Sequence, residues 1–170
     1  MIRFEHGRAR GRADACLAHR PASCQTEHTG NTIRRAGMSI TGQCHCGAIR
    51  YTAEGADEHH ALCHCADCRR WSGAPMVGWI AFREEQVTIT GTATVYSSSE
   101  HGRRAFCRDC GTGLFYRNAV VLPGIVDIQS GTLDSPQDRA PAAQIMCREK
   151  LPWLAEVETL PAFDTYPGVD

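Results

Sequence analysis

The sequence predicts an all-β fold built from short antiparallel sheets with few short helices. From residue 48 onward, short apolar or alternating segments recur between glycine, proline and other turn-forming residues, which is typical of strands. No segment shows the sustained 3.6-residue apolar period of a long helix. The 10 cysteines of the 170-residue chain fall largely into close groups, and in an intracellular protein such groups indicate metal sites more often than disulfides.

The first two expected strands differ in their apolar pattern. The segment AIRYTA (48–53) places Ile49, Tyr51 and Ala53 on one face, as a half-buried strand requires. The segment MVGWIAF (76–82) is almost continuously apolar and suits a strand buried on both faces. Trp79 within it is therefore expected in the core.

The later strands follow at short intervals. VTIT (87–90) and ATVYS (93–97) flank Gly91-Thr92, which predicts a hairpin. RRAFC (103–107), GLFYR (113–117) and GIVDIQSG (124–131) complete the set. Single helical turns are expected after Cys65 and near 135–138. Asp127 is expected to form a turn near Gly131, and Cys147 to be a buried strand residue.

The chain divides into an extension and one domain. Residues 1–37 are rich in Arg, Ala, Gly and His, lack either structural period and carry few large apolar side chains. Such a composition does not bury enough surface to offset the entropy lost on ordering, so we expect a disordered extension, and we suspect that the protein naturally starts at Met38. The zinc-binding domain is predicted at 38–165, long enough to bury a core.

Charge and hydropathy exclude two classes of partner. The net charge of -1 combines a basic extension with an acidic body, which argues against non-specific nucleic-acid binding. No apolar run is long enough to span a bilayer, and no secretory signal is evident in the first forty residues. We therefore expect no membrane association and a cytoplasmic location.

Four cysteines in two pairs predict a closed metal site. Cys107 and Cys110 form a Cys-x-x-Cys pair followed by Gly111, the turn of a zinc knuckle. Cys44 and Cys46 form a tighter pair that enters a strand. Together they offer four thiolates, the ligand set of a structural zinc, which would join segments that are far apart in the sequence.

Three further cysteines, Cys63, Cys65 and Cys68, are left without a fourth partner in the segment ALCHCADC. Three protein ligands with one vacant coordination position are typical of a catalytic zinc. Three thiolates also suit a thiol as the incoming ligand. The sequence thus predicts two zinc ions per chain and a small-molecule thiol as substrate.

Other readings of the cysteines stay open at this stage. His64 or His45 could supply a fourth ligand and make the triplet structural. Cys65 and Cys68 could instead pair with Cys107 and Cys110, although the intervening segment is unusually long for a zinc ribbon. A redox role for Cys-x-x-Cys would need a βαβ setting, which the sequence does not show.

Five segments together resemble one known family: GQCHCGAIRY, CHCADCRRWSGAP, GTATVYSSSEHGRRAFCRDCGTGLFY, DIQSGTLDSP and KLPWL. In this order, from about 40 to 163, they resemble the glutathione-dependent formaldehyde-activating enzymes, a domain that also occurs in centromere protein V. The resemblance implies an all-β zinc fold called a β-tent. It also implies a structural zinc on the four-cysteine group, a catalytic zinc on the triplet, and a carbon–sulfur lyase activity that adds glutathione to formaldehyde, giving S-hydroxymethylglutathione.

One position departs from the family's pattern. Many members carry a histidine where this chain has Gln144, in PAAQIMCREKLPW. If that histidine assists proton transfer or binding, this chain's activity or substrate differs from that of those members.

Residues beside the triplet are candidates for further roles. His64 could return a proton to the developing alkoxide, and Arg69 and Arg70 could hold substrate carboxylates. Each also has a plain structural reading, as a surface or supporting residue. The alternative function for the whole domain is a non-catalytic, zinc-stabilised scaffold for protein interactions, which would have no need of a vacant metal position.

Overall fold

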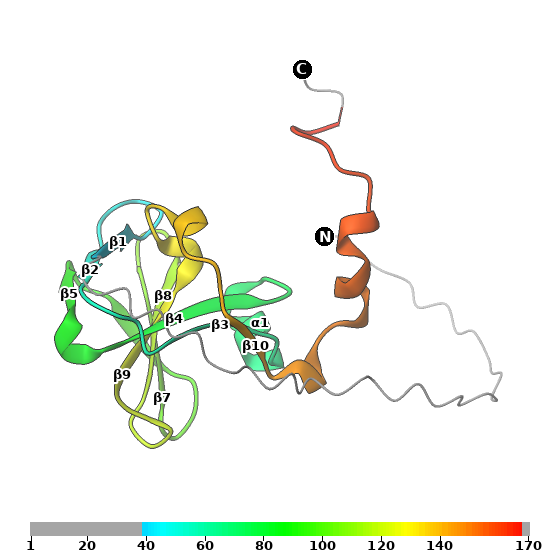
Figure 1. The fold of residues 1–170 in the computed structure, drawn as a ribbon. Helices are drawn as coiled ribbons and strands as arrows, with labels where there is room; N and C mark the ends of the chain where they lie inside the picture. Colours follow the sequence, from blue (N-terminus) through cyan, green and yellow to red (C-terminus); the bar gives the residue numbers. More distant parts are fainter. Residues whose placement is uncertain (1–38, 168–170) are drawn as a thin grey trace, which may run out of the picture. The chain divides into compact units, whose positions relative to one another are not determined.

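The computed structural model describes residues 39–167. The predicted extension at 1–37, with Cys16 and Cys24, lies outside this range. The elements are β1 (Ile40–Gln43), β2 (Arg50–Ala53), β3 (His59–Cys63), α1 (Ala66–Ser72), β4 (Val77–Arg83), η1 (Glu84–Gln86), β5 (Val87–Thr90), β6 (Thr94–Ser97), β7 (Gly102–Phe106), β8 (Gly113–Asn118), β9 (Leu122–Gln129), η2 (Ser130–Thr132), η3 (Pro136–Asp138), β10 (Ala143–Ile145), η4 (Cys147–Glu149) and η5 (Pro152–Thr159), where η denotes a 3₁₀ helix (Figure 1). The predicted mainly β class is confirmed.

The strands form two sheets. The smaller has the order β1-β2-β5, and the larger has the order β10-β3-β4-β9-β8-β7-β6. Neighbouring strands are antiparallel except for β10, which runs parallel to β3 at the edge of the larger sheet. Because β3 ends at Cys63 and α1 begins three residues later, one end of this sheet carries the cysteine triplet.

The core lies between the two sheets. Tyr51 of the smaller sheet meets Phe115 of the larger one edge to face, with ring centroids 5.5 Å apart. Around them pack other fully buried apolar side chains from both sheets, among them Ala53, Ile80 and Phe82. The burial of these apolar side chains supplies the main favourable contribution to the free energy of folding.

The opposite face of the larger sheet is less apolar, and we call it the site face. Arg104 of β7 lies opposite Tyr116 of β8, which lies opposite Asp127 of β9. Ala81 of β4 and His59 of β3 continue this row. Residues paired across neighbouring strands point to the same side of a sheet, so these five side chains share one face.

The predicted hairpin at 87–97 is wrong. β5 pairs with β2 in the smaller sheet, whereas β6 pairs with β7 in the larger one. Between them, Gly91 takes a positive φ of 92° and passes so close to Ala48 that an added Cβ would lie 2.2 Å from its carbonyl oxygen. The glycine thus allows the chain to cross between sheets rather than to fold back on itself.

Two predicted single-residue placements are also wrong. Asp127 lies within β9 rather than in a turn, and its buried carboxylate is 3.1 Å from His59. Cys147 begins η4 and is half-buried, not a buried strand residue. The expected helical turns after Cys65 and near 135–138 are present as α1 and η3. Within residues 39–167, no helix combines the length and the apolar character that crossing a membrane requires.

Candidate metal centres

The four-cysteine group joins the two sheets. Cys44 and Cys46 lie in the turn after β1, and Cys107 and Cys110 lie in the turn between β7 and β8. All four sulfur atoms lie within 4.8 Å of one another. The Sγ atoms of Cys44 and Cys46 are 3.5 Å apart, and those of Cys46 and Cys107 are 3.7 Å apart.

Backbone geometry positions these thiols. Gly111 has a φ of 76°, which lets its amide donate to the Cys107 carbonyl at 2.8 Å and turns the chain so that Cys110 returns toward Cys107. On the other loop, the amide of Ile49 donates to Cys44 Sγ at 3.3 Å. Amide hydrogen bonds to sulfur favour the thiolate, which is the form that binds metal.

The donor set fits a tetrahedral zinc ion. A Zn–S bond of about 2.3 Å places two sulfurs of a tetrahedron about 3.8 Å apart, close to the observed separations. Thr112 Oγ1, 3.2 Å from Cys110 Sγ, helps lower the pKa of that thiol to about 5. The chain therefore already stabilises a thiolate in this group.

The cysteine triplet lies where β3 gives way to α1. Cys63 is the last residue of β3, Cys65 is the N-cap of α1, and Cys68 is in the first turn of the helix. Their three sulfurs also lie within 4.8 Å of one another. The amide of Cys68 donates to Cys65 Sγ at 3.3 Å, so the sulfur also satisfies an otherwise free donor at the helix start.

The triplet could hold a metal ion with three thiolates. Hydrogen bonding from Cys63 and from Arg104 lowers the pKa of Cys68 to about 5, against the opposing effect of burial. In the described part of the chain, the metal-ligating groups contain no histidine, and the triplet shares no cysteine with the four-cysteine group. The structure thus separates the seven cysteines into two clusters that could bind metal, and the zinc-ribbon partition is not formed.

His64 points its ring at Gln144, not at the sulfurs of either group. It is fully buried, and its Nε2 lies 2.9 Å from Gln144 Oε1, which also accepts from Lys150 Nζ at 3.0 Å. Because the amide oxygen can only accept, the shared proton belongs to Nε2 of His64. Gln144 therefore fixes the tautomer of a histidine that stands between two of the triplet's cysteines.

The two arginines after the triplet differ in their surroundings. Arg69 Nη1 donates to the backbone carbonyls of His64 and Glu149, which ties α1 to the segment after β10. Arg70 is exposed in the last turn of α1. Of the pair, Arg70 is the accessible side chain, whereas Arg69 is engaged by two backbone carbonyls.

Arg104 is the residue beside the triplet that sequence reasoning missed. Its side chain is only 3% exposed, and Nη2 lies 2.5 Å from Asp67 Oδ2 and 3.6 Å from Cys68 Sγ. Its guanidinium carbon lies 4.9 Å from the centroid of the Tyr116 ring and 5.7 Å from that of the Trp71 ring, within cation–π range. In the sequence, the alternation in RRAFC places Arg104 on the same side of the strand as Phe106, and this pattern could have indicated an inward-facing arginine.

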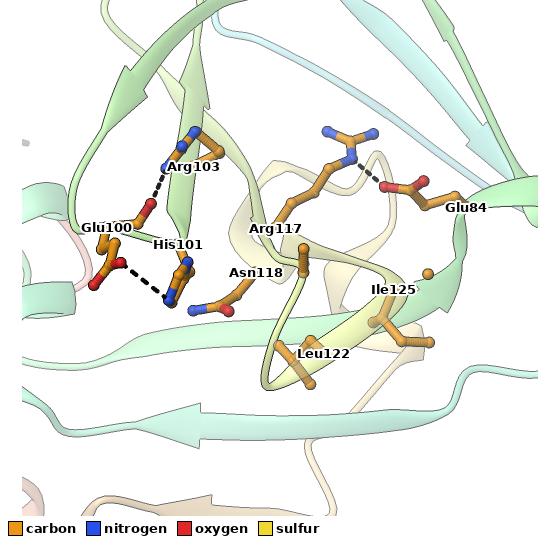
Figure 2. Close-up of a pocket in the computed structure, with 10 residues that line it drawn as sticks. Glu84, Glu100, His101, Arg103, Arg117, Asn118, Leu122 and Ile125 are labelled. Atoms are coloured by element: carbon orange, nitrogen blue, oxygen red, sulfur yellow. Dashed lines mark hydrogen bonds and ion pairs between the residues drawn. The ribbon is translucent and has the colours of Figure 1, made fainter.

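One surface hollow lies away from both cysteine groups. It holds about 350 Å³ between the segment that precedes β7 and the turn between β8 and β9, and its charges are largely paired (Figure 2). Glu84 binds Arg117 at 2.7 Å, and Arg103 donates to three backbone carbonyls. The residues that line this hollow include no cysteine of either group.

Two comparisons with known proteins bear on this arrangement. The sequence model of the glutathione-dependent formaldehyde-activating enzyme family matches residues 39–149, which include all seven clustered cysteines. The chain is also 32% identical over 75 residues to a protein of Schizosaccharomyces pombe named as an uncharacterized lyase. That alignment covers 44% of this chain and 55% of the yeast protein, so it spans about half the length of the relative.

Proposed function

Because the chain belongs to the glutathione-dependent formaldehyde-activating enzyme family, we propose that it is a zinc-dependent carbon–sulfur lyase. Its substrate is the adduct of glutathione, or a related thiol, with formaldehyde or a related aldehyde. The observation that carries the proposal is the triplet: three sulfurs within 4.8 Å of one another, with no fourth ligand in the group. Cys63, Cys65 and Cys68 would hold a zinc ion there, which would supply an open coordination position and lower the pKa of a bound thiol.

The two groups take different roles in this proposal. Cys44, Cys46, Cys107 and Cys110 hold a structural zinc, because four thiolates complete a tetrahedron and leave no position for substrate. Cys63, Cys65 and Cys68 hold the second zinc, which is the catalytic one. Seven thiolates must stay reduced for this, so we place the protein in a reducing compartment, the cytoplasm.

The residues around the triplet orient the reactants. The exposed Arg70 is suited to meet a carboxylate of the thiol. His64 has its Nε2 held by Gln144, and its buried Nδ1 has no hydrogen-bond partner among residues 39–167, so this nitrogen is the candidate proton acceptor beside the triplet. Gln144 stands where many family members have a histidine. In this chain its role is to hold the imidazole of His64.

The competing function is a zinc-stabilised scaffold for protein interactions. One observation favours it: the C-terminal stretch exposes several large apolar side chains, including Trp153, Leu160 and Phe163. Exposed apolar side chains of this kind often mark interaction surfaces. A scaffold, however, makes no use of a metal position that a small thiol can enter.

Thiol binding separates the two functions. In a cobalt-substituted chain, glutathione should add a sulfur ligand and change the sulfur-to-metal charge-transfer bands, and Cys65→Ser should abolish that change. In the zinc protein, carbon-13 exchange spectroscopy should show faster interconversion of hydrated formaldehyde and S-hydroxymethylglutathione. A spectrum that saturating glutathione leaves unchanged contradicts the lyase and favours the scaffold.

A further inference from the structure

Four hydrogen-bond donors are buried without acceptors on the site face of the larger sheet. They are Arg104 Nε and Nη1, Trp71 Nε1 and Gln129 Nε2; each is buried and has no hydrogen-bond partner within residues 39–167. Buried polar groups are normally paired, so such a group calls for an explanation. Asp127 Oδ1 on the same face also lacks a hydrogen bond, but it lies 3.1 Å from His59 Nε2. The other unpaired atoms of this face are nitrogens that donate, which indicates that their missing partner is an acceptor.

Arg104 and Trp71 lie beside the cysteine triplet, and Gln129 meets Trp71 over Gly113. Arg104 contacts Cys68 through Nη2, and Trp71 follows Cys68 by one helical turn on α1. The Trp71 and Gln129 nitrogens converge over Gly113, where a Cβ atom would lie 2.8 Å from Trp71 Nε1 and 2.6 Å from Gln129 Nε2. The absence of a side chain at Gly113 is what allows both donors to approach this spot.

The charge and rigidity of the cluster favour an anion. Within the described residues, the acidic partner of Arg104 is Asp67, whose side chain is 67% exposed and engages only Nη2. Tyr116 and Trp71 flank the guanidinium and restrict its movement. A fixed, desolvated arginine with two uncommitted nitrogens, next to two neutral donors, matches a carboxylate, which is an acceptor with four lone-pair sites.

We propose that Arg104, Trp71 and Gln129 form a subsite that binds a carboxylate of the thiol substrate beside the metal triplet. This inference rests on the proposed function and narrows its substrate class to thiols that carry a carboxylate near the sulfur. The ligand enters past Tyr96, whose ring stacks on Trp71 with centroids 5.9 Å apart. Tyr96 is half-exposed and lies on β6, the terminal strand of the sheet, so its displacement breaks little of the structure.

Two small thiols that differ in a single group test the subsite. Binding of 3-mercaptopropionate and of 3-mercaptopropionamide to the zinc-loaded full chain is measured by calorimetry, and the ratio of their dissociation constants is compared between variants. The wild type should favour the carboxylate roughly tenfold or more, as charge-assisted hydrogen bonds suggest. Arg104→Gln should bring the ratio close to one, and Trp71→Phe, which keeps the ring and removes the N–H, should lower it by roughly threefold.

Arg103→Gln is the matched control. It removes the same charge one residue earlier, from an exposed side chain on the opposite face of β7, and should leave the ratio unchanged. A ratio that survives in both Arg104→Gln and Trp71→Phe overturns the subsite. Zinc content is measured in parallel; if Arg104→Gln loses the triplet's metal, Trp71→Phe decides by itself.

The outcomes for the two proposals are distinct. If the wild type binds both thiols equally, the subsite is wrong and the lyase proposal stands. If the wild type binds neither of these thiols but glutathione changes the cobalt spectrum, the subsite is wrong and the lyase proposal stands. If glutathione also leaves the spectrum unchanged, the lyase proposal is wrong and the subsite falls with it.

Discussion

Replacing one ligand in each cysteine group should produce unequal losses of stability. The stabilities of Cys46→Ser and Cys65→Ser can be compared directly. Cys46 is exposed and Cys65 is half-buried, so neither change opens a cavity in the core. Each should lower the metal content from about two zinc ions per chain to about one. The stability of the fold should depend mainly on the zinc ion of the four-cysteine group.

The expected difference in unfolding free energy depends on the length of the loop that each metal ion closes. A metal on the four-cysteine group links Cys46 to Cys107 across 61 residues, and treating it as a cross-link gives about 4 kcal/mol of stabilisation. The triplet closes only a few residues at the start of α1. Since loop-closure entropy scales as (3/2)RT ln n, its contribution should be smaller by roughly 2 kcal/mol.

Urea unfolding of the full chain, with zinc measured on the same samples, gives both quantities. Cys46→Ser should lose about twice the free energy of unfolding that Cys65→Ser loses, while Cys65→Ser keeps native circular dichroism. Equal losses in the two variants, or a Cys65→Ser chain that fails to fold, would refute the division into a structural and a catalytic site.

Substitutions at four further positions have defined outcomes. Gly91→Ala should cost about 3–5 kcal/mol in urea unfolding because it adds both positive-φ strain and a clash with backbone, whereas Gly124→Ala, with a φ of 69° and nothing within 4 Å of its added Cβ, should cost only about 1 kcal/mol. Two neighbouring histidines should shift the pH profile of stability in opposite directions. The hydrogen bond to the buried aspartate of β9 raises the pKa of His59, so its stabilisation is complete below pH 6.5 and is lost as the pH rises through the raised value; a His59→Gln variant whose unfolding midpoint is unchanged at pH 5.5 would contradict this. Burial lowers the pKa of His60, so the unfolded chain binds its proton first and stability falls below pH 6.5; His60→Gln should reduce this acid-side loss. Gln144→Ala should remove the acceptor from the buried imidazole next to the triplet and lower stability by about 1–3 kcal/mol, whereas Gln144→Glu, which retains an acceptor, should cost less in thermal unfolding.

The metal chemistry was largely readable from the chain itself. The intervals in Cys44-x-Cys46 and Cys107-x-x-Cys110 are so short that both sulfurs of a pair can reach one metal ion. The structure places all four sulfurs within 4.8 Å of one another. The mainly β class could also be predicted from local sequence, because it depends on alternation and turn residues within segments of four to eight residues. Strand β3 was missed because HHALC has neither alternation nor a long apolar run.

The partners that residues acquire across the fold were decided by tertiary structure alone. Nothing near Gly91 in the sequence shows that β5 and β6 belong to different sheets, because strand pairing depends on which distant strands compete for each edge. Arg104 reads as a surface charge in RRAFC, and it becomes a buried neighbour of Cys68 only because α1 packs over β7 and covers it with Trp71. The sequence by itself therefore determined which atoms can bind metal, since that follows from residue type and short spacing. The surroundings of the triplet, on which selection of a substrate depends, came from long-range packing.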